Sequence, residues 1–409
     1  MHGIPCLIAL ALLALLSGCI GGNGTNPAAA PSPPTANVLT LTVDSGPSAA
    51  TGQINHAYVT VKVCAPGSQS CANIDHVLLD TGSNGLRLVA SVLVSYSLAL
   101  PNQADTRGNV IEECVSFTGG QTWGPVRSAD VFLAGEKALN VPVQVMNDTN
   151  TGAAPPATCG ANGTLINDVA GFGANGVLGV GLFAQDCGRA CVAAANPLPV
   201  YYGCDAAGAC SAENVALDQQ VANVVAQFAA DNNGIIINLP NLANANGDAS
   251  VRGELIFGLS TQTDNMLPAT GITILGADSS GDFTANYNGS ATALPALIDS
   301  GTDAYAFDDP QIAVCSTGAY IGYYCPTAAP QAAFAVNTGV GLYTASNTVD
   351  FAIADPSTFV AGAAAIADLA GGGGSTNFVW GMPFFYGRPV YLGIDQRVSG
   401  AYTGPFYAY

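Results

Sequence analysis

A short motif occurs twice in this chain, once in each half. The first copy reads Leu-Leu-Asp-Thr-Gly-Ser over residues 78–83, and the second reads Leu-Ile-Asp-Ser-Gly-Thr over residues 297–302. Each copy is followed later in its half by an apolar pair and a glycine, at residues 177–179 and 379–381. A chain with two such halves is expected to fold as a duplicated lobe, with one Asp-containing loop from each copy.

The residue types in this motif suit a buried acidic loop. The apolar pair anchors the strand, and the aspartate emerges where the strand ends. The glycine allows a tight loop in which backbone N–H groups approach the carboxylate. The hydroxyl residue after the glycine can donate a hydrogen bond to its own aspartate, and the one before the glycine can bond across to the opposite loop. The candidate site residues are therefore Asp80, Asp299, Thr81, Gly82, Ser83, Ser300, Gly301 and Thr302.

With these two loops in place, the chain resembles the pepsin-like aspartic peptidases from about residue 38 to residue 409. Residues 116–124 and 130–135 are similar to the family's flap hairpin and its return strand. Residues 253–258 resemble the strand at the junction of the lobes, and residues 379–385 resemble a late apolar-apolar-Gly segment. The flap residues that the resemblance implies are Phe117, Thr118, Gly119 and Gly120.

The resemblance implies a fold and an activity. The fold is all-β, with a few short helices and two lobes at residues 38–252 and 253–409, one Asp loop in each. The activity is that of a monomeric aspartic endopeptidase, which hydrolyses polypeptide at acidic pH with a water activated by Asp80 and Asp299 and without metal or cofactor. Two carboxyls in close contact cannot both ionise, so one proton is shared and one pKa is strongly raised.

An alternative function is a catalytically silent surface lipoprotein of the same fold that binds peptide or protein, because a fold does not determine an activity. The presence of both aspartates and their hydroxyl neighbours favours the enzyme. A protein that only binds has no physical need for two carboxyls in so costly an environment.

The chain departs from the family at three places. A tyrosine is usual in the flap where Phe117 stands, and a tryptophan that bonds it is common where Arg87 stands. Because both ends of one hydrogen bond change together, a different attachment of the flap is expected. A buried Arg87 would also lower the pKa of a nearby carboxyl. Residues 20–43 contain no Lys or Arg, so no basic pro-segment is visible and acid-triggered self-activation is not expected.

The N-terminus resembles that of an exported bacterial lipoprotein. Residues 4–16 form an apolar run that is too short to span a bilayer and is typical of a signal peptide. Residues 16–19 resemble the lipobox, so residues 1–18 are the expected signal peptide and Cys19 the expected lipidation site. An ordinary secretory signal remains the alternative. Ile20 after the cysteine suggests the outer membrane, with residues 19–37 as a flexible tether to the cell envelope.

The charge and the cysteine content of the chain limit which binding partners and which cross-links are expected. With 28 Asp plus Glu against 9 Lys plus Arg, the net charge of −19 argues against a nucleic-acid partner. This charge either keeps the protein soluble or suits it to acid. Removing Cys6 and lipidating Cys19 leaves ten cysteines, an even number that suggests disulfides in an exported chain. The expected pairs are 64–71, 315–325 and 114–159, with Cys187, Cys191, Cys204 and Cys210 pairing among themselves.

The sequence gives little support to other classes of catalytic or metal site. The cysteine spacings contain no CxxC pair and the chain has only three histidines, which argues against a zinc cluster and a histidine-dependent hydrolase. His76 is expected to be an exposed strand residue. Alternation of apolar residues predicts strands at residues 38–43, 57–63 and 76–80, whereas helical spacing predicts helices at residues 214–230 and 356–369.

Overall fold

A computed structural model describes residues 37–149, 153–159, 164–244, 246–328, 330–372 and 376–409. The expected signal peptide, Cys19 and the tether up to residue 36 lie outside the described residues. The described chain is β-rich, with short strands joined by turns and loops. This agrees with its high content of glycine and proline, which favour turns.

The first part of the chain builds one β-rich lobe. Two α-helices, α1 (Ala90–Ser95) and α2 (Val169–Phe172), and the 3₁₀ helices η2 (Gly188–Cys191), η3 (Leu217–Gln219) and η4 (Val225–Gln227) lie between its strands. Its strands are β1 (Val38–Val43), β2 (Ala57–Cys64), β3 (Cys71–Asp80), β4 (Asn84–Val89), β5 (Val110–Phe117), β6 (Gly120–Leu133), β7 (Glu136–Met146), β8 (Gly176–Val180), β9 (Tyr201–Cys204), β10 (Cys210–Ala212), β11 (Gly234–Asn238) and β12 (Val251–Phe257).

The second part is built from shorter strands and two 3₁₀ helices, η5 (Pro356–Thr358) and η6 (Met382–Phe385). Its strands are β13 (Ile274–Gly276), β14 (Phe283–Tyr287), β15 (Leu294–Ile298), β16 (Tyr305–Ala306), β17 (Gln331–Thr338), β18 (Ser346–Ile353), β19 (Ala370–Gly371), β20 (Phe378–Trp380), β21 (Pro389–Gly393), β22 (Val398–Ser399), β23 (Tyr402–Thr403) and β24 (Phe406–Ala408).

The same strand arrangement surrounds both copies of the motif. In the first lobe β8 runs parallel to β3, with Asp80 opposite Gly179, and antiparallel to β4, which follows the loop. In the second lobe β20 runs parallel to β15, with Ile298 opposite Trp380, and antiparallel to β16. The apolar-apolar-Gly segments that the sequence marks as repeats are therefore strands that lie beside the Asp loops.

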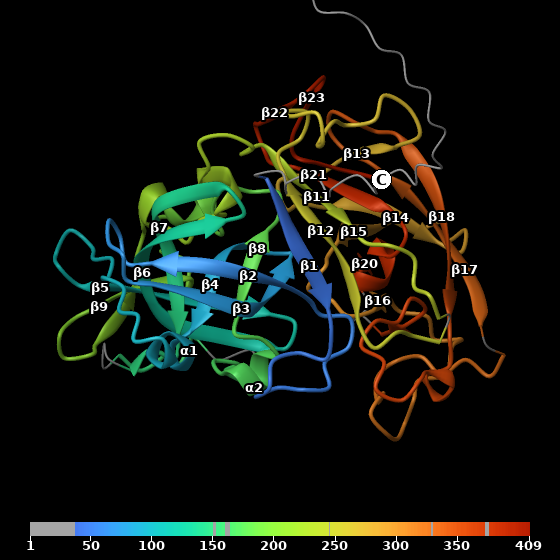
Figure 1. Ribbon diagram of the computed structural model, residues 1–409, viewed down its shortest axis with the longest axis horizontal. Coiled ribbons are helices and arrows are strands. Elements are labelled where there is room, and N and C mark those ends of the chain that lie inside the picture. The colour runs from blue at the N-terminus through green and yellow to red at the C-terminus, as the bar shows by residue number, and fades with distance from the viewer. Residues whose placement is uncertain (1–36, 150–152, 160–163, 245, 329, 373–375) are drawn as a thin grey trace, which may run out of the picture. The chain divides into compact units, whose positions relative to one another are not determined.

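A band of strands joins the two lobes. The order β1-β12-β11-β21-β24-β13 continues the large sheet of the first lobe into strands from the end of the chain. Figure 1 shows β1, β11 and β12 between β2–β9 on one side and β14–β18 on the other. The predicted strand at residues 253–258 belongs to β12, which pairs with β1 and β11. The predicted lobe boundary between residues 252 and 253 falls inside β12 and remains a prediction.

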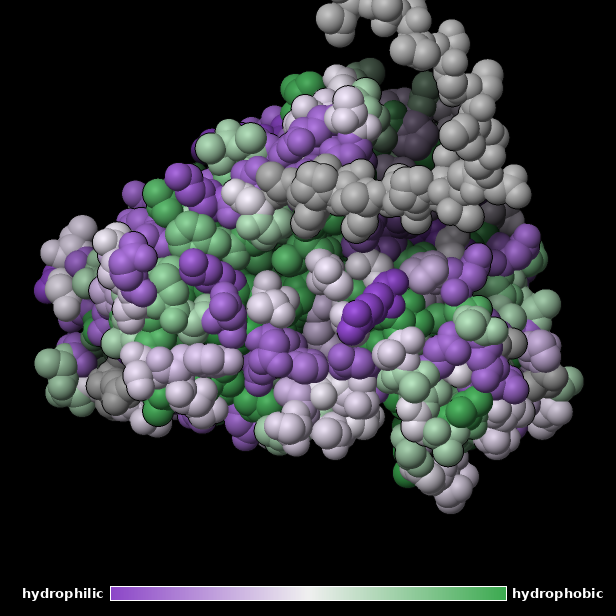
Figure 2. All heavy atoms as spheres, viewed as in Figure 1, coloured by the Kyte–Doolittle hydropathy of each residue, from purple (hydrophilic) through white to green (hydrophobic). Residues whose placement is uncertain are grey.

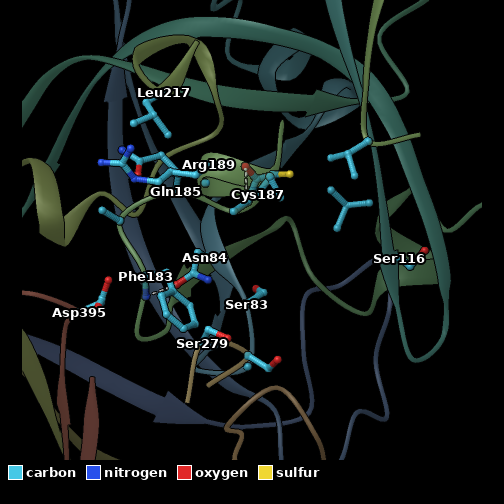
Figure 3. A pocket seen from close by; sticks show the side chains of 18 of the residues that line it. Ser83, Asn84, Ser116, Phe183, Gln185, Cys187, Arg189, Leu217, Ser279 and Asp395 are labelled. Carbon is cyan, nitrogen blue, oxygen red and sulfur yellow. Dashed lines mark hydrogen bonds between the residues drawn. The ribbon is translucent and has the colours of Figure 1, made fainter. Parts of the chain in front are cut away.

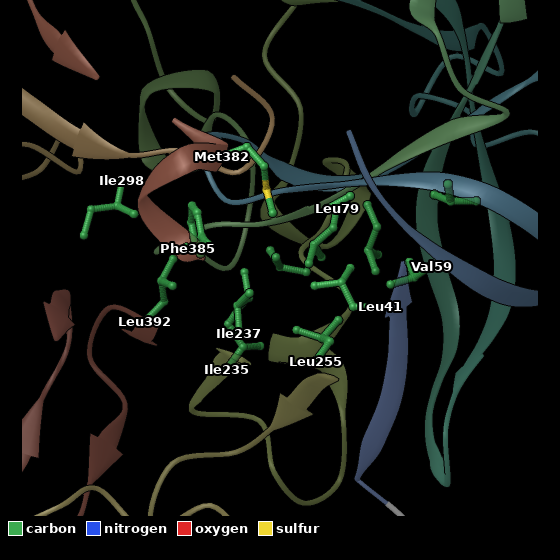
Figure 4. Close-up of a cluster of buried hydrophobic side chains, with 14 of the residues drawn as sticks. Leu41, Val59, Leu79, Ile235, Ile237, Leu255, Ile298, Met382, Phe385 and Leu392 are labelled. Atoms are coloured by element: carbon green, nitrogen blue, oxygen red, sulfur yellow. The ribbon is translucent and has the colours of Figure 1, made fainter. Parts of the chain in front are cut away.

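The core under these strands is shared by both halves of the chain. Leu79 and Ile298, the residues directly before the two motif aspartates, have no exposed surface. They belong to one apolar cluster with Leu41 of β1 and with Met382 and Phe385 of η6, as Figure 4 shows. Burying this apolar surface stabilises the strand ends from which both Asp loops emerge.

The predicted helices are wrong. Residues 214–230 contain only η3 and η4, although Val221 and Val225 are buried. Gln220 and Asn223, which stand beside these apolar positions, are also buried. Their side chains donate to the carbonyls of Gly188, Val215 and Gly181, which compensates for their burial. The apolar residues at helical spacing thus pack into separate clusters, Val221 in one and Val225 in another, and do not line one face of a helix.

Residues 356–369 are likewise not a helix. They contain η5 alone, and Gly362 has a left-handed φ of 78°. The backbone N–H groups of Ala364 and Ala365 both donate to Asp248 O, a long-range contact that replaces helical hydrogen bonds. The three predicted strands are confirmed, as β1, β2 and the end of β3.

The predicted disulfides are confirmed. Bonds join residues 64 to 71, 114 to 159 and 315 to 325, and the four remaining cysteines pair as 187 to 191 and 204 to 210. The Cys114–Cys159 bond fastens β5 to the segment before α2. The Cys187–Cys191 bond closes η2.

Hydrophilic and hydrophobic residues are interspersed over the face of the molecule in Figure 2. The most exposed large apolar side chains come from separate elements, such as Val94 of α1, Leu139 of β7 and Val398 of β22. No helix in the described part of the chain has the length and apolar character needed to cross a membrane.

Candidate active site

The two Asp loops meet between the lobes. Asp80 ends β3, and Asp299 directly follows β15. A Cβ atom built on Gly82 would lie 2.6 Å from Asp299 Cγ, and one built on Gly301 would lie 2.7 Å from Asp80 Oδ1. Each carboxylate therefore packs against the glycine of the opposite loop, and any larger residue there would displace it.

Each carboxylate is held by its own loop in the same way. The Gly82 N–H donates to Asp80 Oδ1 at 2.8 Å, and the Ser83 hydroxyl donates to Asp80 Oδ2 at 2.5 Å. In the second loop the Gly301 N–H donates to Asp299 Oδ1 at 2.8 Å, and the Thr302 hydroxyl donates to Asp299 Oδ2 at 2.6 Å. These are the hydrogen bonds expected from the motif, and they fix the orientation of both carboxyls.

The residues after the two aspartates connect the loops. The Thr81 hydroxyl donates to Ile298 O at 2.8 Å and accepts from the Ser300 N–H at 2.9 Å. The Ser300 hydroxyl donates to Leu79 O at 2.7 Å and accepts from the Thr81 N–H at 3.1 Å. Because all four bonds are buried, the loops form one rigid unit that spans both lobes.

The surroundings favour a proton on Asp80. Burial raises its pKa first, and the charge of Asp299 and a hydrogen bond between the two carboxyls raise it further, to about 8. The Ser83 hydroxyl and the Gly82 N–H act in the opposite direction, because they stabilise the ionised form. The Asp80 carboxyl therefore favours its protonated form in a setting with little solvent.

The predicted flap is a β-hairpin. Strands β5 and β6 pair from Glu112 opposite Pro125 to Phe117 opposite Gly120, which leaves Thr118 and Gly119 at the tip. The Phe117 ring packs edge-on against Phe172 of α2, with ring centroids 5.3 Å apart. At the position of the expected tyrosine, the hairpin therefore makes an apolar contact instead of a hydroxyl hydrogen bond.

Arg87 is buried, a possibility considered from the sequence. It lowers the pKa of a nearby carboxyl, as expected, but burial of that carboxyl has a larger and opposite effect. Its guanidinium forms ion pairs with Glu113 at 2.7 Å and Asp186 at 3.1 Å. Burial raises the pKa of Glu113 well above its ordinary value, and the opposing effect of Arg87 is smaller. Arg87 is not among the groups that shift the pKa of Asp80.

A cavity of about 1480 Å³ opens beside the first Asp loop. One wall contains Gly82, Ser83 and Asn84, and the neighbouring walls come from Ser116 of the flap hairpin and residues 183–190. Residues 277–280 and 395–397 of the second lobe complete it. Figure 3 shows Ser83, Asn84 and Phe183 close together, with Ser116 on a separate wall. Cavities that bind small ligands usually have a volume of about 300–1,000 Å³, so this one can hold a longer segment.

Sequence reasoning missed several buried polar residues around the site. Asn55 has no exposed surface, and its side chain donates to the Asp303 and Ile366 carbonyls, which ties the β1–β2 loop to the segment after Thr302. Glu113 and Asp186 were not singled out either. Their signal was weak, because an acidic residue in a strand, such as Glu113, or in a loop, such as Asp186, is usually exposed.

The two histidines considered against a hydrolase contact residues other than Asp80 and Asp299. His76 is a partly exposed residue of β3, and its ring nitrogens lie 2.8 Å from Asp75 and 3.6 Å from Asp44. His56 Nδ1 contacts the Tyr58 hydroxyl at 3.1 Å. No group of three or more metal-ligating side chains was found among the described residues.

These features define a class of fold: two β-rich lobes, each with one Asp-Thr/Ser-Gly loop, with the two loops in contact. The crystal structure of the aspartic proteinase from Irpex lacteus matches with a TM-score of 0.52 and 15% sequence identity, over 91% of this chain and 96% of that one. At this identity the match shows the fold alone, and it confirms the β-rich bilobal fold expected from the sequence.

The family is shown by a second comparison. The family model described as "Protein of unknown function (DUF3443)" matches residues 33–409, so the chain belongs to that family. Curated protein sequences gave no significant match.

Proposed function

We propose that this protein is an aspartic endopeptidase that hydrolyses peptide bonds in polypeptides. The observation that carries the proposal is the contact between the Asp80 and Asp299 carboxyls, each packed against the glycine of the opposite loop. A protein that only binds peptide would not need this pair. A pair that carries one proton offers both a general base and a general acid, which can together catalyse the addition of water to a peptide bond.

The reaction follows from the charges of the pair. The ionised carboxyl takes a proton from a water, which attacks the peptide carbonyl carbon. The protonated carboxyl donates to the carbonyl oxygen, which carries the developing charge of the tetrahedral intermediate. Breakdown of the intermediate delivers a proton to the leaving nitrogen. The pair titrates as a unit, so the two roles are not assigned to one aspartate each.

The pH range of the proposed activity follows from the shared proton. We expect cleavage of unfolded protein at pH 3–5, as the sequence suggests. The raised pKa of Asp80 extends the singly protonated pair toward neutral pH, because burial and Asp299 hold the proton. On the alkaline side, activity should therefore fall as the pH rises through the pKa of that carboxyl, because the proton donor is lost. On the acid side it should fall when the second carboxyl is also protonated, because the base is lost.

The decisive test is an assay of purified protein on a broad peptide library from pH 3 to 8, with a statine-type transition-state analogue as inhibitor. Asp80→Asn and Asp299→Asn should each reduce the cleavage rate by at least about a thousandfold without unfolding the protein. Asp350→Asn, at an exposed position of β18, serves as the matched control and should retain activity. A folded wild type that binds peptides but cleaves none of them would support the binding alternative.

We also propose that the protein acts as a monomer at the bacterial cell envelope, held by a lipid on Cys19. The support is the sequence of residues 1–19 alone. Metabolic labelling with a fatty acid should mark the wild type and not a Cys19→Ala variant. Labelling of both would contradict the lipid anchor and leave the peptidase proposal untouched.

A further inference from the structure

Arg87 is the most unusual charged residue near the site. It lies on β4, directly after the first Asp loop, and its side chain is only 1% exposed. Its Nη1 donates to Asn84 O at 2.8 Å, a carbonyl at the end of the loop. Its Nη2 donates to Glu113 Oε1 at 2.7 Å and to Asp186 Oδ2 at 3.1 Å.

The two acidic partners form a second carboxyl pair. Glu113 and Asp186 both contact the same guanidinium nitrogen of Arg87. Burial raises the pKa of Glu113 well above its ordinary value, and the nearby charge of Asp186 raises it further. The Tyr201 hydroxyl donates to Asp186 Oδ1 at 2.6 Å and accepts from the Val221 N–H at 2.8 Å. The pair is therefore held in place from both sides.

This cluster also reaches the flap hairpin. Glu113 and Phe117 both belong to β5, the first strand of that hairpin. The Arg87 guanidinium carbon lies 5.8 Å from the centre of the Phe117 ring, within the range of a cation–π contact. Arg87 thus contacts the end of the Asp80 loop, two residues of the flap strand and one wall of the cavity.

A buried ion pair of this kind contributes little to stability, because the cost of removing the charges from water offsets their attraction. What it supplies is geometry, since the planar guanidinium presents several donors in a fixed arrangement. An apolar residue would fill the same volume without setting these directions.

We propose that Arg87 is a positioning residue that sets the flap hairpin relative to the Asp80 loop. The functional meaning of this role rests on the proposed peptidase function. The attachment of the flap hairpin by Arg87 does not, because it can be measured in a protein without activity.

The experiment compares hydrogen–deuterium exchange of residues 115–121 in the wild type and two variants. Arg87→Lys keeps a cation beside Glu113 and Asp186, so no buried charge is left uncompensated, but it lacks the planar fork. Phe117→Leu keeps an apolar lid and removes the ring together with its contacts to Arg87 and Phe172, so Arg87→Lys is the variant that isolates the guanidinium. Each should speed exchange in the hairpin at least fivefold and leave the β17–β18 hairpin unchanged.

The matched control is Arg388→Lys, because Arg388 also stacks on a ring, 4.4 Å from the centre of Phe384 on η6. It should leave exchange in the flap hairpin unchanged. Wild-type exchange rates in folded Arg87→Lys and Phe117→Leu would overturn the proposal.

Kinetics separate positioning from a general loss of stability. If the wild type cleaves peptides, Arg87→Lys should raise KM at least threefold while the pH limits of activity stay where they are, since Arg87 does not shift the pKa of Asp80. An altered pH profile with unchanged KM would also overturn the proposal. If the wild type cleaves nothing, the proposed function fails, and the exchange experiment still tests Arg87.

Discussion

At the scale of single residues, Asp80 links the site to the stability of the fold. Burial and the charge of Asp299 raise its pKa to about 8, whereas a carboxyl in the unfolded chain has a pKa of about 4. Between these values the folded protein holds a proton that the unfolded chain has lost. Its free energy of unfolding therefore decreases as the pH rises through this window.

We expect Asp80→Asn to remove this dependence, because the amide carries no charge at any of these pH values. The variant should match the wild type at pH 4 and exceed its stability at pH 8 by on the order of 2 kcal/mol or more. Thermal unfolding of both proteins between pH 4 and 8 tests this. If stability falls as steeply in Asp80→Asn as in the wild type, Asp80 is not the group responsible.

Ser300 offers a second test at this scale. Its hydroxyl bonds Leu79 O and the Thr81 N–H of the opposite lobe, and Ser300→Ala would leave both groups buried without a partner. We expect a loss of about 2–4 kcal/mol in the free energy of unfolding. The matched control is Ser346→Ala on β18, whose hydroxyl is exposed and should cost less than about 0.5 kcal/mol. Equal losses in urea unfolding would mean that the bonds between the loops add nothing.

At the scale of elements, the disulfides differ in how much chain they close. The bond from Cys114 on β5 spans 45 residues to Cys159, whereas the bond that closes η2 spans 4 residues. Restricting the unfolded chain stabilises by roughly 4 kcal/mol for the longer loop and roughly 2 kcal/mol for the shorter one.

Replacing Cys114 and Cys159 together by serine should therefore lower the free energy of unfolding more than the same change at Cys187 and Cys191. Urea unfolding of the two double variants measures the difference. A larger loss at the short loop would show that the disulfide acts mainly on the native structure and not by restricting the unfolded chain.

At the scale of the whole molecule, charge repulsion should dominate the response to salt. The chain carries a formal net charge of −19 at pH 7, and protonation of carboxyls in acid reduces it. Raising the ionic strength from about 0.01 M to about 0.15 M shortens the range of that repulsion. The melting temperature at pH 7 should rise by a few degrees, and the increase should be much smaller at pH 4. A melting temperature that falls with salt at pH 7 would contradict this expectation.

Three features of the protein were predictable from the sequence: the two Asp loops, several strands and the disulfides. The motif identified the loops because it occurs twice, each time behind an apolar pair and ahead of an apolar-apolar-Gly segment. The alternation of apolar residues in β1 and β2 predicted strands, because one face of each is buried. Short-range disulfides such as Cys64–Cys71 were predictable because the two cysteines lie close together in the sequence.

What the sequence could not provide depends on contacts between distant segments. Residues 214–230 have helical spacing, but Gln220 and Asn223 bond carbonyls far along the chain and prevent a helix. The contact between Asp80 and Asp299 was expected only from the resemblance to a known family, because the two residues lie in different halves of the chain. The meeting of Arg87 with Glu113 and Asp186 was not expected, because no local signal in the sequence connects these three residues. A sequence determines which side chains are available and how each strand alternates. Only the packing of one lobe against the other decides which of them share a proton, because that depends on distance and burial in three dimensions.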